Sequence, residues 1–422
     1  VSAYGGITND LLEHKKSKKT GIYKLFEQKK NYKDAITKLK KQLFKINQSF
    51  VPFGLDLNEA NHFIESRIDQ AVEILESMQV VMSSGYVNKQ ELLLSARELL
   101  ASLGEMHSAH NSTNILKNRG YNATYVDLSG WGNGKECTID QRIKEAFKKI
   151  DPSKTICFAT GYTKGTEGIM REFDRGYSEV TFSKIAVLLK AKEAVIHKEF
   201  HLCSGDPALI GVKKVKPVCN TNSDVADQLA DVDMEAIHPK ASKALENAGI
   251  SIRVKNAFEP DHEGTLISKD YICPHSRIEV ITGSDKVTTL MIHDPRMVGE
   301  VGFDRKIMYT LEQHGVSFIC KMTNANTIEI VVKDKDYTGA LLKDLRSKFE
   351  KVTKCEVAIV CAIGSNIAKP GIMAIAAAAL AKRKINILAV SQTSRQTNMQ
   401  FLVERDKFIV AQQVLHKALC ES

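Results

Sequence analysis

The sequence has no long hydrophobic run and no recognisable secretion signal. Among its 422 residues, the most apolar helix-like stretch, 372–381, is rich in alanine and is followed directly by Lys382, Arg383 and Lys384. A helix that spans a bilayer needs about 20 mostly apolar residues, so we expect no membrane segment. The chain begins at Val1, in an apparent strand, rather than at a methionine. We therefore expect that a preceding stretch is missing from it.

Paired cysteines are also absent. The nine cysteines are scattered, and no two of them have the C-x-x-C spacing of zinc or redox sites. An odd number of isolated thiols is typical of a reducing compartment. We therefore expect a cytoplasmic protein without a structural zinc site.

Positive charge is present in excess, with a formal net charge of +9. Many of the lysines lie between His14 and Lys45. Such a patch can bind nucleic acid, but Ile36, Leu39 and Leu43 recur at helical spacing among these lysines. This pattern favours the solvated face of an amphipathic helix, so we expect no nucleic-acid partner.

Strand-like and helix-like segments alternate over the first part of the chain. Strand patterns occur at 1–3, 121–128, 155–161 and 194–196, and helical periodicity dominates up to about residue 120 and again over 182–194. This alternation favours an α/β fold with a mainly parallel sheet.

A repeat begins near Lys286. A strand, helix, strand, strand, helix pattern over 287–349 recurs with an offset of 69 residues, which places Gly302 on Gly371 and Leu311 on Leu380. We predict two ferredoxin-like β-α-β-β-α-β units in tandem. The expected domains are 1–275, with an N-terminal strand and Gly-rich loop missing, then 285–350 and 353–422.

Three glycine-containing polar clusters lie at 5–9, 104–109 and 173–179, each expected at a helix start. Backbone amides at such a start favour anions. Arg175 would grip a carboxylate through two hydrogen bonds, and Glu105 would hold an ammonium group. Together the clusters suit an amino acid with a second acidic group.

A metal site is another interpretation of some of these residues. His107 and His110, with Glu105, have a spacing that can bind a metal ion, although packed histidines explain the pattern more simply. Neither the G-x-x-x-x-G-K-[ST] phosphate loop nor the protein-kinase catalytic loop occurs. A protein with this sequence would therefore bind ATP with another fold.

Six motifs in order resemble those of the aspartate kinase family. They are Val1-Ser2-Ala3-Tyr4-Gly5-Gly6-Ile7-Thr8-Asn9, Gly104-Glu105-Met106-His107-Ser108-Ala109, Gly161-Tyr162, Arg175-Gly176-Tyr177-Ser178-Glu179, Ala236-Ile237-His238-Pro239, and Asn256-Ala257-Phe258-Glu259-Pro260 with Gly264-Thr265-Leu266-Ile267. The repeat resembles the family's two ACT domains. The resemblance implies an amino-acid kinase three-layer sandwich followed by an ACT pair.

The resemblance also implies a site. ATP with Mg²⁺ would phosphorylate the side-chain carboxylate of L-aspartate, the first step of a pathway to the aspartate-family amino acids, such as lysine and threonine, or to ectoine. The aspartate pocket would be lined by Ser2, Thr8, Glu105, Tyr162, Arg175, Ser178 and Glu179. Arg175 and Glu179 would be the catalytic pair. Nucleotide contacts would come from His197, Lys198, Asp206 and Pro207.

Several positions depart from the family pattern. Glu179 stands where the family has Asp, and only Asp206-Pro207 is clear in the nucleotide segment 197–207. Ile319 replaces an Asp of lysine-sensitive members. In these segments the chain resembles the divergent branch of the family that is linked to ectoine synthesis.

We expect a homodimer built through the ACT domains, with an amino-acid effector as a further partner. The alternatives are a binding homologue that has lost turnover, or another amino-acid kinase, such as a glutamate kinase.

Overall fold

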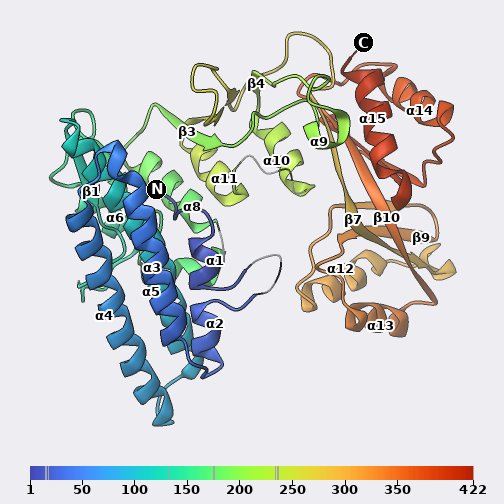
Figure 1. The fold of residues 1–422 in the computed structure, drawn as a ribbon. Coiled ribbons are helices and arrows are strands. Elements are labelled where there is room, and N and C mark those ends of the chain that lie inside the picture. Colours follow the sequence, from blue (N-terminus) through green and yellow to red (C-terminus); the bar gives the residue numbers. More distant parts are fainter. Residues whose placement is uncertain are drawn as a thin grey trace. The chain divides into compact units, whose positions relative to one another are not determined.

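A computed structural model describes the chain except residues 15, 16, 18, 133, 174, 175, 233, 235, 236 and 422 and the side chain of Glu172. Arg175 and Ala236, which belong to the motifs above, thus lie outside the described residues. The chain forms two compact units, Val1–Ala191 and Lys192–Ser422 (Figure 1). No helix in the described part of the chain is long and apolar enough to cross a membrane.

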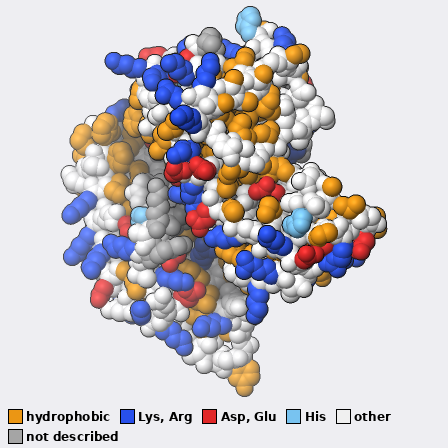
Figure 2. Space-filling view, turned by 90° about the vertical axis from the view of Figure 1, so that its right-hand side faces the viewer, with side chains coloured by type: hydrophobic (Ala, Val, Ile, Leu, Met, Phe, Trp, Pro, Cys, Tyr) orange, Lys and Arg blue, Asp and Glu red, His pale blue; other side chains and the backbone are white. Residues whose placement is uncertain are grey.

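The first unit begins with a group of helices. They are α1 (Ile7–Leu11), α2 (Ile22–Glu27), α3 (Lys33–Phe50), the 3-10 turn η1 (Val51–Phe53), α4 (Leu57–Ser83) and α5 (Lys89–Asn118). Helix α3 buries Ile36, Leu39 and Leu43 and exposes most of its lysines, which confirms the predicted amphipathic helix. On the face in Figure 2, Lys and Arg side chains occur in several groups with Asp and Glu between them.

A small sheet follows these helices. Strands β1 (Ala123–Val126) and β2 (Ile156–Ala159) pair in parallel, and helices α6 (Ile139–Phe147), α7 (Ile169–Phe173) and α8 (Tyr177–Leu188) lie between and after them. The carbonyl of Val1 accepts a 2.9 Å hydrogen bond from the amide of Gly161. Residues 1–3 are not part of a strand and Val1 is 46% exposed, so the prediction of a strand there is wrong. Val1 nevertheless lies beside the end of β2, because its nitrogen also donates a 2.7 Å hydrogen bond to the carbonyl of Ala159.

The position of residues 104–109 also differs from the prediction. They lie inside α5 and are buried, rather than at a helix entrance. A Cβ atom on Gly104 would lie 2.8 Å from Cβ of Ala3 and 3.1 Å from Cγ2 of Ile7. Gly104 therefore allows the N-terminal segment to approach the middle of α5 closely.

The second unit contains a four-stranded sheet in the order β3-β5-β6-β4. Its strands are β3 (Glu193–Lys198), β4 (Asn220–Thr221), β5 (Ser251–Asn256) and β6 (Thr265–Ile267), and its helices are α9 (Pro207–Ile210), α10 (Ser223–Asp231) and α11 (Pro239–Asn247). Strands β3 and β5 are parallel, and their carboxyl ends meet where Lys198 pairs with Asn256.

A six-stranded sheet in the order β11-β12-β10-β7-β9-β8 completes this unit. Its strands are β7 (Val280–His293), β8 (Cys320–Thr323), β9 (Thr327–Lys333), β10 (Lys351–Ile363), β11 (Ala389–Gln392) and β12 (Asn398–Glu404). The accompanying helices are η2 (Pro295–Met297), α12 (Phe303–Gln313), α13 (Gly339–Lys348), α14 (Ile372–Lys382), η3 (Arg405–Lys407) and α15 (Phe408–Leu419).

The two ferredoxin-like units are nested rather than strictly consecutive. Residues 287–293 of β7 pair with β9 and with the start of β10, whereas residues 280–284 pair with the end of β10. The second unit therefore takes its fourth strand from a segment that precedes the first unit. A bulge places Asp285 and Lys286 opposite Ala358, and Gly283 is required because a Cβ there would collide with the carbonyl of Ile359.

Both faces of β10 are buried. Ala358, Val360 and Ala362 pack into a core with α14 and α15. Ile359 and Cys361 face a second core that also contains residues of α10. Because side chains alternate along a strand, this two-sided burial explains the continuous apolar run at 357–363.

Candidate active site

Glu105 lies at the centre of the polar residues in the first unit. It projects from the middle of α5 and is 2% exposed. The hydroxyl of Ser178, in the first turn of α8, donates a 2.5 Å hydrogen bond to its Oε1. A Cβ on Gly161 would lie 2.8 Å from Oε2 of Glu105 and 2.9 Å from Cβ of Ser178. Three of the predicted motifs therefore meet at one carboxyl group.

The Glu105 carboxyl group has an unusual proton affinity. Burial raises its pKa from 4.5 to about 7, and the hydrogen bond from Ser178 opposes that rise. Its Oε2 has no hydrogen-bond partner of good geometry among the described residues, although the amide of Tyr162 and the charge of the Val1 ammonium group also lower the pKa. A buried, unpaired carboxylate oxygen is costly, and a bound ammonium group would supply the missing partner.

The N-terminal motif contacts the same helix. The hydroxyl of Ser108 donates a 2.7 Å hydrogen bond to the carbonyl of Ser2. Gly6 precedes α1 with φ of 84°, a left-handed conformation that favours glycine. Thr8 follows in α1 and is partly buried. The motif thus forms the expected turn into a helix beside α5.

Tyr162 is buried, and its hydroxyl donates a 3.1 Å hydrogen bond to Oε2 of Glu98. The other carboxyl oxygen of Glu98 accepts a 3.1 Å hydrogen bond from the amide of Met170. Burial raises the pKa of Glu98. The sequence did not single out Glu98, because it stands in an apolar-periodic helix without a motif of its own.

The third motif places Ser178 and Glu179 in the first turn of α8. Gly176 precedes that helix with φ of 98°, so the predicted glycine turn into a helix is confirmed. Glu179 is partly exposed.

The histidines of α5 take part in packing and hydrogen bonding. Nε2 of His107 lies 2.6 Å from Oδ1 of Asn47, and burial lowers the pKa of His107 to about 3. His110 stacks on Phe63 with ring centroids 3.9 Å apart. In the described part of the chain, no group of three or more His, Cys, Asp or Glu side chains could hold a metal ion.

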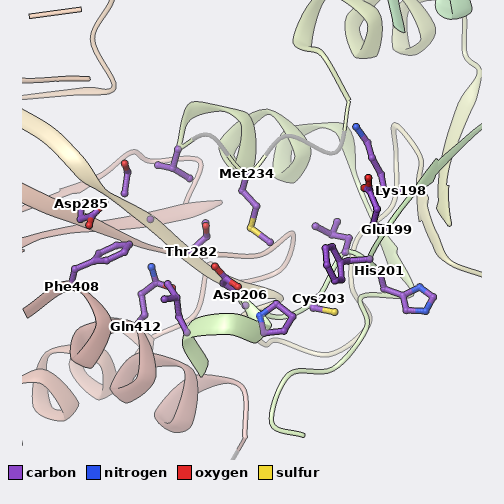
Figure 3. A pocket seen from close by; sticks show the side chains of 18 of the residues that line it. Lys198, Glu199, His201, Cys203, Asp206, Met234, Thr282, Asp285, Phe408 and Gln412 are labelled. Carbon is purple, nitrogen blue, oxygen red and sulfur yellow. The ribbon is translucent and has the colours of Figure 1, made fainter. Parts of the chain in front are cut away.

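The predicted nucleotide residues lie in the second unit. Lys198, Asp206 and Pro207 line one cavity of about 540 Å³ (Figure 3). His197 is exposed and does not line it, since neighbouring residues of β3 point to opposite faces. The cavity thus brings together three of the four predicted residues, at the carboxyl end of β3.

The other wall of the cavity comes from the six-stranded sheet and α15. Thr282 and Asp285 lie on β7, and Phe408 and Gln412 lie on α15. In Figure 3 these side chains stand across the cavity from Lys198, Glu199 and His201. The sequence did not predict this wall, because its residues lie far along the chain from the nucleotide segment.

Comparison with known proteins shows the family of the chain. The profile of the amino acid kinase family matches residues 1–256, and an ACT domain profile matches residues 360–419. The chain belongs to the amino acid kinase family. Within it, the chain is 42% identical to aspartate kinase Ask_Ect of Stutzerimonas stutzeri, over 100% of the chain and 90% of that protein. It is 27% identical to the chloroplastic aspartokinase 1 of Arabidopsis thaliana, over 85% of the chain and 67% of that protein.

Solved structures show the same fold as this amino acid kinase. The structure of E. coli aspartokinase III in complex with aspartate and ADP matches with a TM-score of 0.71 and 18% identity, over 99% of the chain and 91% of that structure. Clostridium acetobutylicum aspartate kinase matches with a TM-score of 0.69 and 20% identity, over 99% and 91%. The predicted fold class and the resemblance to the aspartate kinases are confirmed.

Proposed function

We propose that this protein is an aspartate kinase, which transfers the γ-phosphoryl group of ATP to the side-chain carboxylate of L-aspartate and forms 4-phospho-L-aspartate. The observation that carries the proposal is the buried Glu105, bonded to Ser178 and left with Oε2 unpaired among the described residues. An amino-acid ammonium group would complete it. The 42% identity to an aspartate kinase over the whole chain supports the choice of substrate.

Aspartate would lie in the first unit. Glu105 would hold the α-ammonium group, with Ser2, Thr8, Tyr162 and Ser178 around the rest of the molecule. Arg175, assigned from the motif alone, would grip the α-carboxylate through its planar fork. Glu179, near the reacting carboxylate, would complete the catalytic pair with Arg175.

ATP would occupy the cavity in the second unit as its Mg²⁺ complex. Lys198 offers positive charge to the phosphates, and His197, Asp206 and Pro207 belong to the same nucleotide segment. Mg²⁺ bound with a nucleotide needs only one or two protein carboxylates, because phosphates and water supply its other ligands. The exposed carboxylate of Asp206 on the cavity wall fits that need. Phosphoryl transfer depends mainly on the alignment of the two reacting groups and on neutralisation of the negative charge on the phosphates.

We also propose how the domains and subunits of this enzyme are arranged and where it acts. Residues 1–275 would form the catalytic domain, and 285–350 and 353–422 the ACT pair, with an amino acid as effector. A homodimer would form through the ACT domains, which light scattering on the whole protein would test. The nine free cysteines suit a cytoplasmic enzyme. Its similarity to Ask_Ect, stronger than to the plant aspartokinase, favours the ectoine branch.

A coupled assay of ADP release tests the function. We expect ADP release that depends on L-aspartate, and little with L-glutamate. Glu105→Gln should lose most of this activity, whereas Glu136→Gln, at an exposed position of the same unit, should keep it. No release with aspartate would leave a binding homologue without turnover, and preference for glutamate would point to another amino-acid kinase.

A further inference from the structure

A second cavity, of about 350 Å³, lies within the first unit. Its walls come from α4 and α5, which pack side by side (Figure 1), and from the segments that follow β1 and β2. Of the predicted aspartate residues that the structure describes, only Tyr162 lines it, whereas Glu105 and Ser178 do not. The cavity is therefore separate from the carboxyl group proposed to hold aspartate, and its volume falls in the range of small-molecule sites, about 300–1,000 Å³.

One wall of this cavity is apolar. Ile74 and Met78 line it from α4, where they lie one helical turn apart on the same face. Leu99 of α5 and the ring of Trp131 complete the wall. The indole Nε1 of Trp131 donates a 3.0 Å hydrogen bond to Oγ of Ser102, which fixes the ring. An apolar group of a ligand would be stabilised against this wall by removal from water.

Two oppositely charged side chains also line the cavity. Lys164 is exposed, and its Nζ makes no ion pair or hydrogen bond among the described residues. Glu98 is partly buried, and its oxygens accept hydrogen bonds from two uncharged groups, the Tyr162 hydroxyl and the Met170 amide. Burial raises the pKa of Glu98, and the charge of Lys164 only partly opposes that rise. A further positive charge beside Glu98 would therefore stabilise its ionised form.

We propose that this cavity binds an α-amino acid with an apolar side chain. The carboxylate of the ligand pairs with Lys164, its ammonium group pairs with Glu98, and its side chain packs on the apolar wall. A carboxylate has about four lone-pair sites, so Glu98 accepts the new hydrogen bond and keeps the two it has. Aspartate fits less well, because its second carboxylate would lose water against apolar groups. The site lies outside the ACT units, so it is distinct from the effector site proposed there.

Fluorescence of Trp131 reports on this cavity directly, because the chain has a single tryptophan. We expect L-leucine, added without ATP, to change its emission in a saturable way. L-leucinamide, which lacks the carboxylate, and isocaproate, which lacks the ammonium group, should each bind roughly tenfold more weakly or worse, as loss of one ion-pair partner does. Lys164→Met should weaken L-leucine binding by a similar factor. Lys149→Met, at an exposed position of the same unit, is the matched control and should behave as wild type.

Calorimetry with the same ligands separates this site from the aspartate pocket. Glu105→Gln should still bind L-leucine, and an excess of L-aspartate should not displace it. Loss of L-leucine binding in Glu105→Gln, or its displacement by aspartate, would place the ligand in the aspartate pocket and overturn the proposal. So would the absence of binding by L-leucine, L-methionine and L-phenylalanine, or equal binding of L-leucine and L-leucinamide by the wild-type protein. None of these measurements requires catalysis, so a failure of the proposed kinase activity would be seen separately in the ADP-release assay.

Discussion

Oγ of Ser204 lies 2.9 Å from Nε2 of His416, although 212 positions separate the two residues in the chain. The hydroxyl oxygen also accepts a 3.0 Å hydrogen bond from the amide of Lys216. Nδ1 of His416 then donates to Oε1 of Glu421, 2.9 Å away. This chain of hydrogen bonds joins helix α15 to the loop that leads into Asp206.

We predict that His416→Ala destabilises the protein by about 2–4 kcal/mol, because it removes one buried and one partly buried hydrogen bond and leaves a cavity. It should also raise KM for ATP more than KM for aspartate, since the loop that it anchors carries Asp206. Urea denaturation and steady-state kinetics measure the two effects. His275→Ala, at an exposed position, should change stability by less than about 0.5 kcal/mol. Equal denaturation midpoints for His416→Ala and wild type would contradict the prediction.

The raised pKa of Glu105 predicts a pH effect on stability. Its folded pKa, about 7, lies above the ordinary value of 4.5. The folded protein therefore holds this proton more tightly than the unfolded chain does. The resulting stabilisation is complete below about pH 4.5 and is lost as the pH rises through 7, by about 3 kcal/mol in total.

Glu105→Gln removes that dependence. Relative to wild type, the variant should gain stability between pH 5 and pH 8 by an amount on the order of 3 kcal/mol, while its activity with aspartate falls. Thermal or urea unfolding at several pH values measures the difference. In the wild-type enzyme, KM for aspartate should rise below about pH 7, because a protonated Glu105 cannot pair with an ammonium group. A stability difference that is constant with pH would show that Glu105 titrates normally.

Glu179 should act on turnover. It replaces the shorter Asp of the family pattern, near the expected path of the phosphoryl group. We predict that Glu179→Gln lowers kcat at least tenfold, since a carboxylate that acts in the transition state is lost, and changes KM for aspartate little. Initial rates at saturating and limiting aspartate separate the two parameters. A similar change in kcat and KM would assign Glu179 a structural role instead.

The hydrogen bond between Tyr162 and Glu98 should position the aspartate pocket. Removing the hydroxyl in Tyr162→Phe leaves the ring in place and costs about 1 kcal/mol of stability. We expect KM for aspartate to rise by roughly two- to tenfold with a smaller change in kcat. The reason is that a wall of the pocket binds the substrate and the transition state about equally. Kinetics of Tyr162→Phe and Glu98→Gln check this. If only one of the two variants raises KM, the pair does not act together.

Lysine should inhibit this enzyme weakly or not at all. Ile319 packs against an apolar core and cannot accept a hydrogen bond from an effector ammonium group, as an Asp at that position could. Without differential binding to two states, an effector cannot shift activity. Activity measured with millimolar lysine should stay close to that without lysine. Strong inhibition would mean that another group supplies the missing contact.

Features that depend on neighbouring residues could be predicted from the sequence. Gly302 and Gly371 precede α12 and α14 with φ of 95° and 97°, so the repeat was visible as a local pattern of glycine turns and apolar spacing. The turns before α1 and α8 were predicted for the same reason. The motifs around Glu105 and Ser178 identified the family, because each motif is a short continuous stretch of residues.

Other features depended on contacts between distant segments, which only the tertiary structure decides. Gly104 marked a close approach of Ala3 inside a long helix rather than a helix start. Strand β7 serves both ACT units, because its two ends pair with different parts of β10. Glu98 carries no motif, and its place in the site arises from its hydrogen bond with Tyr162. Propensity and spacing act over a few residues, whereas strand pairing and the burial of a polar group depend on which distant residues the fold brings together.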